Sequence, residues 1–288
     1  MTAVTTQAVE PRPSGRRSLL RQPGIAFGAA LLAILVFVAV FAPFLGTIDP
    51  TTLSAFDRTR NPDAEFWFGT DMLGRDVYSR VIYGTRVSLI VGFSVAIAST
   101  IIGVLIGVFA GFVRWLDAIV MRVMDGLMAI PSILLAVALI ALNRASIWNV
   151  ILAVTIAEMP RMVRLVRGIV LSLREEPYVE AARVAGASVP WIVVRHIIPN
   201  TVAPIVVQAT YICAVAVLAE AALSFIGAGV PPTTPSWGNI MAEGRSLWQI
   251  KPYIIFFPAL FLSITVLAIN MLGDGLRDAL DPRMTKRI

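Results

Sequence analysis

The chain has very few of the side chains that most often do chemistry in proteins. Its 288 residues include one cysteine, Cys213, and one histidine, His196. A single cysteine excludes an internal disulfide, and a lone histidine without a second ligand of its kind disfavours a metal site. The sequence also lacks a G-x-x-x-x-G-K-[ST] phosphate loop, an H-E-x-x-H motif and a nucleophile elbow. We therefore expect no catalytic residue and no cofactor in this chain.

Charged residues are also scarce. They make up 15% of the chain against 57% hydrophobic residues, and the mean hydropathy is +0.80. This is too apolar for a soluble domain of this size and predicts an integral membrane protein. The net charge of +6 would suggest nucleic acid in a soluble protein, but the positive-inside rule explains it better here. We expect the chain to contact a lipid bilayer and no nucleic acid.

The uncharged runs predict an all-α protein with six transmembrane helices. Residues 1–22 are polar and basic and predict a tail ahead of a membrane domain at 23–288. The run from Gln22 to Ile48 has no charge and exceeds the roughly 7–15 residues of a signal-peptide core, so we expect it to stay uncleaved. The spans are expected at about 25–45, 87–113, 126–143, 148–166, 201–226 and 252–272, with Pro131 kinking the third and the charged residues from Arg114 to Asp125 forming a short polar turn before it.

The basic residues predict the orientation of the chain. Six spans place both termini on one side, and we place them in the cytoplasm. The inner segments then hold about twice as many Lys and Arg residues as the outer ones. This orientation puts the external segments at 46–86 and 227–251, and a polar loop at 168–200 in the cytoplasm, where ATP is.

The cytoplasmic loop contains a stretch, Pro177–Pro199, with the signals of two short helices. Pro177 suits the first turn of a helix, alanines follow it, and Gly186 is a natural residue to end that helix. Ser188 can cap a second short helix, which Pro199 would stop. We predict a helix, a glycine elbow and a second helix that project from the membrane surface.

Five residues in this stretch resemble the EAA loop of the inner-membrane permease subunits of bacterial ABC importers. They are Glu180, Ala181, Ala182, Gly186 and Pro199. The resemblance implies the type I ABC importer permease fold, in which this loop is the coupling helix that docks into a groove on the ATPase subunit. His196 departs from the isoleucine that the family often has there. The alternative from the residues alone is an amphipathic loop helix that only braces the bundle.

Two polar stretches outside the loop resemble the dipeptide, oligopeptide and nickel branch of these permeases. Phe68 to Arg80 follows the pattern F-G-T-D-x-x-G-R-D-x-x-S-R, and the second stretch runs from Ala222 to Arg245. The short first external loop resembles the second of the two permease types in this branch. The resemblance implies a bacterial inner-membrane location and a heterodimer with a homologous permease subunit. It also implies two cytoplasmic ATPase subunits that bind ATP and Mg, and an extracytoplasmic substrate-binding protein.

Four small residues follow one face of the expected second span. Ser99, Gly103, Gly107 and Gly111 recur at four-residue spacing, which lets another helix approach closely. We expect this stripe to serve helix packing rather than substrate contact.

Two carboxylates fall within expected spans. Glu158 has Arg161 one turn on as a ready partner. Glu220 lies near the external end of its span, where a water-filled vestibule would reach it, and the resemblance implies that it either lines the pathway or is structural. Charge at this depth is costly and points to function. Besides the ABC permease, which would form half of a pathway for peptides or a related small solute, a proton-coupled secondary transporter is therefore an alternative. A non-transporting scaffold is a third possibility, and it leaves the external motifs unexplained.

Overall fold

A computed structural model describes residues 23–142 and 145–280 of the chain. Within these ranges the chain is a bundle of helices with no β-strand. The tail expected at residues 1–22 lies outside the described residues. The all-helical class predicted from the sequence is confirmed.

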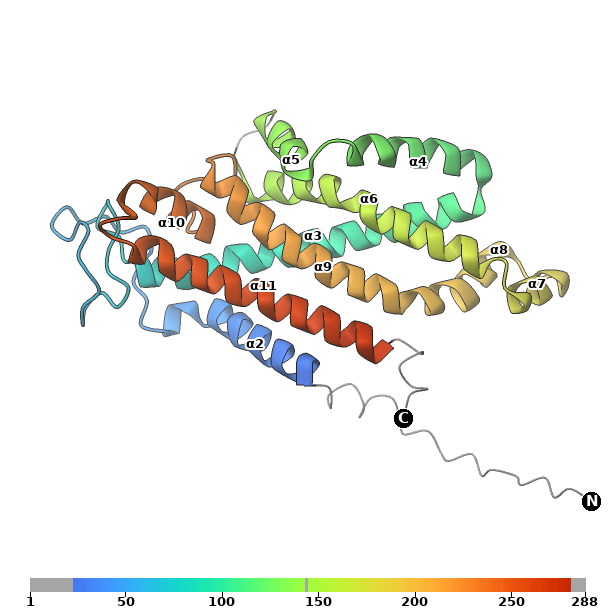
Figure 1. Ribbon diagram of the computed structural model, residues 1–288, viewed down its shortest axis with the longest axis horizontal. Helices are drawn as coiled ribbons and strands as arrows, with labels where there is room; N and C mark the ends of the chain where they lie inside the picture. The colour runs from blue at the N-terminus through green and yellow to red at the C-terminus, as the bar shows by residue number, and fades with distance from the viewer. Residues whose placement is uncertain (1–22, 143–144, 281–288) are drawn as a thin grey trace, which may run out of the picture.

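Long helices run side by side along the molecule (Figure 1). They are α2 (Pro23–Val40), α3 (Val77–Phe112), α6 (Ile147–Leu173), α9 (Ile198–Phe225) and α11 (Tyr253–Leu280). Helix α3 packs along α6 and α9, while α11 lies against α2 and α9. The core between them consists mainly of aliphatic side chains, such as Val95, Val154 and Val217, which are completely or almost completely buried. Helices suit a membrane because their backbone polar groups pair within the element.

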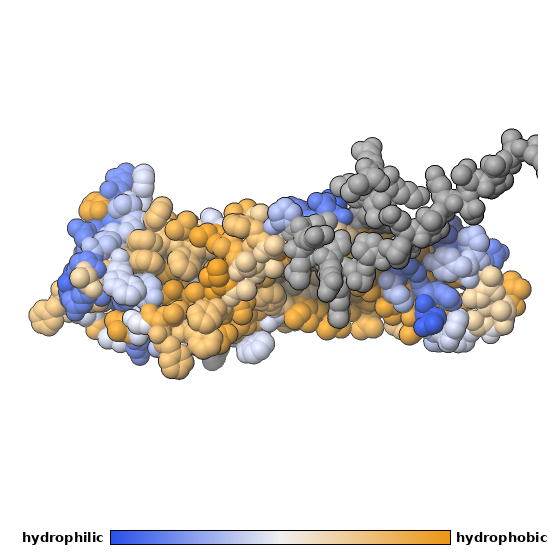
Figure 2. Space-filling model, turned by 90° about the horizontal axis from the view of Figure 1, so that it is seen from below, coloured by the Kyte–Doolittle hydropathy of each residue, from blue (hydrophilic) through white to orange (hydrophobic). Residues whose placement is uncertain are grey.

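Four segments are long and apolar enough to cross a membrane. They are Pro23–Val40, Val77–Phe112, Val189–Phe225 and Tyr253–Leu280, and the bent pair α4–α5 would make a fifth. Helix α6, where we expected the span 148–166, has 27 residues but carries several charges and is not among these candidates. The count of six therefore stays a prediction. On the face that Figure 2 shows, apolar residues dominate the uncovered middle of the molecule and polar residues gather toward both ends.

The span expected at 126–143 is broken in two. Helix α4 covers Arg114–Met128 and helix α5 covers Ser132–Ala141, and the pair is bent by 90°. Pro131 lies at the break, at the N-cap position of α5. The break is sharper than the kink that we expected from a proline inside a helix.

The charged residues before this break form a helix instead of the expected short polar turn. Asp117 and Asp125 of α4 pair with arginines of α6, while Trp115 and Ile119 are exposed. Helix α4 is thus amphipathic, with apolar and charged residues on different sides. The sequence shows the charges, but not the partners on α6 that make a helix favourable here.

Shorter elements occupy the two ends of the bundle (Figure 1). At one end lie α7 (Pro177–Val184), α8 (Val189–Ile192) and the π-helical turn η2 (Val193–Ile197). At the other end lie η1 (Ala42–Phe44), the segment 45–76, α10 (Trp237–Gly244) and η3 (Arg245–Leu247). Residues 77–86, which we assigned to the external segment, form the first turns of α3. With 36 residues, α3 is about 54 Å long and exceeds the roughly 30 Å of a bilayer core.

Candidate functional site: a coupling surface and a polar cap at opposite ends

The stretch expected to contact an ATPase begins with helix α7. Pro177 opens the helix, and Val179 is completely buried against the bundle. Glu180 and Ala181 are exposed on the outside, and Ala182 is half-buried. The helix is thus held by one buried side chain while its carboxylate points away from the protein.

Helix α7 ends in a glycine elbow of defined geometry. Gly186 has φ +86°, the left-handed conformation that glycine adopts without a steric penalty. Its amide donates to the carbonyl of Arg183 at 3.0 Å, and the amide of Ala187 donates to the carbonyl of Ala182 at 3.0 Å. These two bonds form a Schellman motif, which satisfies carbonyls at the helix end. The prediction that Gly186 ends this helix is confirmed, and the structure shows that it does so in the left-handed conformation.

The chain after the elbow differs from our expectation at Pro199. Ser188 occupies the N-cap position of α8, although its side chain makes no capping bond. Helix α8 passes through η2 into α9, and Pro199 lies in the first turn of α9. The π-helical turn lies immediately ahead of this proline, which removes one N–H from the hydrogen-bond pattern. Pro199 therefore begins a long helix, and the prediction that it stops a short one is wrong.

An aromatic cluster that the sequence did not predict braces this end. The ring of His196 lies 5.7 Å from the ring centroid of Tyr178 and 5.1 Å from that of Trp191. The cluster joins α7 to α8 and η2, so the unusual histidine has a packing role here. We call the exposed residues Tyr178, Glu180, Val184 and Trp191 the coupling surface. Val184 is 84% exposed, an unusual state for a valine.

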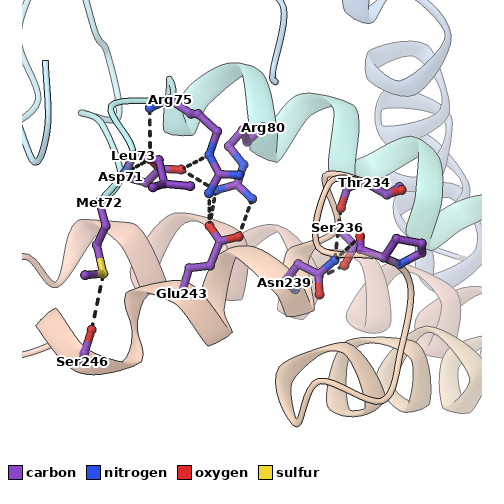
Figure 3. Close-up of polar contacts among 11 residues, drawn as sticks. Asp71, Met72, Leu73, Arg75, Arg80, Thr234, Ser236, Asn239, Glu243 and Ser246 are labelled. Carbon is purple, nitrogen blue, oxygen red and sulfur yellow. Dashed lines mark hydrogen bonds and ion pairs between the residues drawn. The ribbon is translucent and has the colours of Figure 1, made fainter. Parts of the chain in front are cut away.

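Four charged side chains form a network at the opposite end, which we call the polar cap: Asp71, Arg75, Arg80 and Glu243 (Figure 3). One oxygen of Asp71 accepts from Arg75 Nε at 2.7 Å and from Arg80 Nη1 at 2.5 Å. Glu243 Oε2 lies 2.5 Å from Nη2 of Arg75 and 2.5 Å from Nη1 of Arg80. Asp71 and Arg80 are each 1% exposed. Two cations and two anions thus balance one another in a largely buried site.

The remaining residues of the Phe68–Arg80 stretch shape the chain around this network. Asp76 is the N-cap of α3, where its carboxylate accepts from the amide of Ser79 at 2.9 Å. Gly74 has φ +76°, and a Cβ there would lie 1.9 Å from the carbonyl oxygen of Ser54. The motif therefore specifies a tight turn and a helix start, which aim the two arginines at Glu243.

The Ala222–Arg245 stretch is folded against the Phe68–Arg80 stretch. The indole N–H of Trp237 donates to the carbonyl of Val81 on α3 at 3.1 Å. The amide of Asn239 donates to the carbonyls of Pro231 at 3.0 Å and Thr234 at 3.1 Å, which holds the proline-rich loop against α10 (Figure 3). Two stretches whose bonded residues, Trp237 and Val81, are 156 positions apart in the sequence thus form one structural unit. The sequence showed both motifs, but it did not show that they meet.

Glu220 does not line a pathway in this structure. Its side chain is completely buried, and its carboxylate accepts from Ser224 at 2.8 Å and from Ser88 of α3 at 3.1 Å. The two serine hydroxyls thus donate the hydrogen bonds that water would donate to this carboxylate in a hydrated vestibule. The expectation of a pathway-lining Glu220 is therefore replaced by a structural link between α3 and α9.

The stripe of small residues on α3 lies against α6. A Cβ at Gly103 would come within 2.5 Å of Met162, and one at Gly111 within 2.5 Å of Val170. Gly107 is equally close to α6, and Ser99 is completely buried. Close approach of two helix backbones requires such small residues.

The arginines of α6 each have an acidic partner. Arg161 Nη1 lies 2.8 Å from Glu158 Oε2. Arg164 Nη2 lies 2.5 Å from Asp125 Oδ1. Arg167 makes a bidentate ion pair with Asp117, in which Nη2 lies 2.7 Å from Oδ2 and Nε contacts Oδ1. Among the residues that the structure describes, no group of three or more His, Cys, Asp and Glu side chains is placed to hold a metal ion.

Comparison with known proteins identifies close relatives over nearly the whole length. The chain is 51% identical to the probable peptide ABC transporter permease protein y4tQ of Sinorhizobium fredii, over 93% of this chain and 91% of the relative. It is 40% identical to the dipeptide transport system permease protein DppC of Alkalihalophilus pseudofirmus, over 96% of this chain and 91% of the relative.

Comparison with solved structures supports the same fold. A chain of the MetNI methionine ABC transporter, solved in inward-facing conformations, matches with a TM-score of 0.58 and 23% identity. The match covers 70% of this chain and 96% of that one.

The chain also matches a protein family. Residues 103–286 match the family described as the binding-protein-dependent transport system inner membrane component. The chain therefore belongs to this family and is a permease subunit of an ABC importer.

Proposed function

We propose that the chain forms half of a translocation pathway for peptides or a related small solute, and that its coupling surface receives the movement of an ATPase subunit. One observation carries the coupling role: α7 presents Glu180 and Val184 outward on a base fixed by Val179 and by the elbow at Gly186. A small, rigid, exposed helix of this kind suits docking into a groove. The names of the relatives, which include peptide and dipeptide permeases, support the solute class.

The proposed complex contains a second, homologous permease subunit, two cytoplasmic ATPase subunits and an extracytoplasmic binding protein. ATP and Mg would bind to the ATPase chains, where hydrolysis takes place. The charge bias of the sequence supports an orientation with both termini and the coupling surface in the cytoplasm. The polar cap then lies outside, on the side from which the binding protein delivers its solute.

The proton-coupled alternative has no comparable support. A proton relay needs carboxylates that exchange protons with water along a path. Glu220 is completely buried and bonded to two serines, and Glu158 is 1% exposed and paired with Arg161. Both carboxylates thus have partners within the chain: Glu220 joins α9 to α3, and Glu158 pairs with Arg161 on its own helix α6.

Two substitutions test the coupling role in different ways. Glu180→Lys reverses the charge on the outer face of α7, and like charges brought together at an interface cost several kcal/mol. We expect the variant to insert normally, to lose solute uptake and to lose the ATPase that copurifies with it. At position 186 a Cβ would meet no atom within 4 Å, so valine does not clash there. The left-handed backbone conformation of this position, however, costs on the order of 1–2 kcal/mol for a residue with a Cβ. Gly186→Val should misdirect α8 and reduce uptake while Glu180 keeps its charge.

The measurement is uptake in cells beside copurification of the ATPase in detergent. Glu175→Lys is the matched control, because it makes the same charge change on an exposed residue before α7. Gly186→Asn is the control for the elbow, because asparagine tolerates the left-handed conformation better than valine does. If Glu180→Lys and Gly186→Val both transport normally, this loop does not couple the chain to an ATPase.

A further inference from the structure

Contacts between α3 and α6 show which residues lie at the same depth in the bundle. Gly103 of α3 faces Met162 of α6, and Gly107 faces Val166. Arg164 therefore lies level with the part of α3 between Gly103 and Gly107. This part belongs to a run of α3, from Val87 to Val113, that has no charged residue. Because an uncharged run of this length is expected to lie in the hydrocarbon core, Arg164 lies at the depth of that core.

Two sides of the molecule differ in character at this depth. On α3, Leu105 and Phe109 are 56% and 60% exposed, as expected for side chains that face lipid. On the side formed by α4 and α6, the side chains of Arg164 and Asp125 are 47% and 58% exposed. An apolar surface and a charged surface are thus present at the same level of one bundle.

Charged side chains at this depth face the interior of a bundle or a water-filled cavity, because exposure to hydrocarbon is costly. The pair of Arg164 and Asp125 is half exposed, so the interior of this chain does not cover it. The surface continues from Arg161, paired with Glu158, to Arg167, paired with Asp117. We call Asp117, Asp125, Arg161, Arg164 and Arg167 the charged face.

We propose that the charged face lines the aqueous translocation pathway and provides a passage for a hydrophilic solute with charged ends, such as a zwitterionic peptide. This inference rests on the proposed function and replaces Glu220 as the pathway-lining element. Each arginine of the face is already paired with a carboxylate within 2.5–2.8 Å. Paired charges keep a passage hydrated without holding one ionic group tightly, and a passage must release what it admits.

Thiol accessibility in the assembled complex tests this inference. Cys213 is first replaced by Ala, which removes the only native thiol. Gly168→Cys and Ala118→Cys then place single thiols beside the charged face. Both positions are exposed, and a Cβ at Gly168 would meet no atom within 4 Å. Leu105→Cys and Phe109→Cys are the matched controls, because they lie at a similar depth on the apolar side.

The probe is a charged, water-soluble methanethiosulfonate reagent, applied to the complex in membranes opened to both sides. We expect the thiols at positions 168 and 118 to react more than about tenfold faster than those at 105 and 109, because the thiolate that reacts is disfavoured in apolar surroundings. Labelling at 168 should also slow when ATP and vanadate trap the ATPases, since alternating access would close the passage on that side.

The copurifying ATPase activity is measured on the same preparations and separates the two proposals. One outcome would overturn the inference about the charged face and leave the proposed function standing. It is that the thiols at 168 and 118 react as slowly as the controls in a complex that retains its ATPase. They would then be covered by lipid or by the second permease subunit. Absence of any ATPase in the native complex would instead count against the proposed function.

Discussion

The contact between α3 and α6 gives the sharpest test of the packing described above. Gly107 lies at a close approach of the two helices, where its neighbours on α6 include a backbone atom. A Cβ there would be 2.8 Å from the Cβ of Val166 and 2.9 Å from the carbonyl oxygen of Val163, whereas ordinary contacts are 3.4–4 Å. Neither neighbour can rotate away, because one is a β-carbon and the other a backbone atom. Gly107→Ala must therefore push the helices apart.

The structure supplies a control in which the same substitution, glycine to alanine, should not lower the stability of the protein. Gly168 lies on α6 itself, and a Cβ there would meet no atom within 4 Å. Gly168→Ala should be neutral or stabilise the helix by up to about 1 kcal/mol, the difference in helix propensity. Gly107→Ala should destabilise by about 1–3 kcal/mol, as overpacked cores do. The two variants are thus expected to differ by about 1–4 kcal/mol.

The assay is the temperature at which half of the detergent-purified protein is lost from the monodisperse chromatographic peak. We expect Gly107→Ala to melt several degrees below Gly168→Ala, because stability differences of this size move midpoints by that much. Gly107→Leu, with a larger side chain, should also reduce the amount of assembled complex in the membrane. Equal midpoints for the two alanine variants would refute the close α3–α6 contact.

Three further predictions concern orientation, the polar cap and the buried carboxylate. In a Cys213→Ala background, Thr233→Cys should react with an impermeant thiol reagent from outside, and Ser188→Cys only after permeabilisation; the reverse pattern would refute the proposed orientation. Arg80→Met should destabilise the purified protein by about 3–5 kcal/mol in the same melting assay, because it removes one partner from a buried ion network; an unchanged midpoint would show that the network contributes little. Glu220→Gln should preserve uptake, because an amide can still bond the two serines, whereas a proton relay would be abolished by this change.

The sequence predicted best those features that depend on neighbouring residues. The elbow at Gly186 follows from a proline, several alanines and a glycine within ten residues, and the structure shows a left-handed glycine there. The apolar runs likewise predicted the helical membrane fold, because their length and composition are local properties. The resemblance that rests on Glu180 and its neighbours led to the family that the comparisons show.

The sequence predicted least well those features that depend on distant partners. Glu220 in an apolar run suggests a functional charge, and only the fold shows that Ser88, 132 positions away, accounts for it. The charged residues of α4 suggested a turn, because the arginines of α6 that pair with them are about 40 to 50 positions away. The sequence pattern that contains Arg75 and Arg80 was recognised, but the ion network that these arginines form depends on Glu243, which lies in a different motif.

The corrected position of Pro199 bears on how the two ends of the molecule communicate. If Pro199 ended a helix, a joint would separate the coupling surface from the bundle. Instead, α8, η2 and α9 form one helical path from Val189 to Phe225, without a loop between them. Helix α9 carries Glu220, which bonds to α3, and it also packs against α10 beside the polar cap. A displacement of the coupling surface would therefore act directly on a helix that reaches the opposite end, and the π-helical turn at Val193–Ile197 is the place where the hydrogen-bond pattern along this path is least regular.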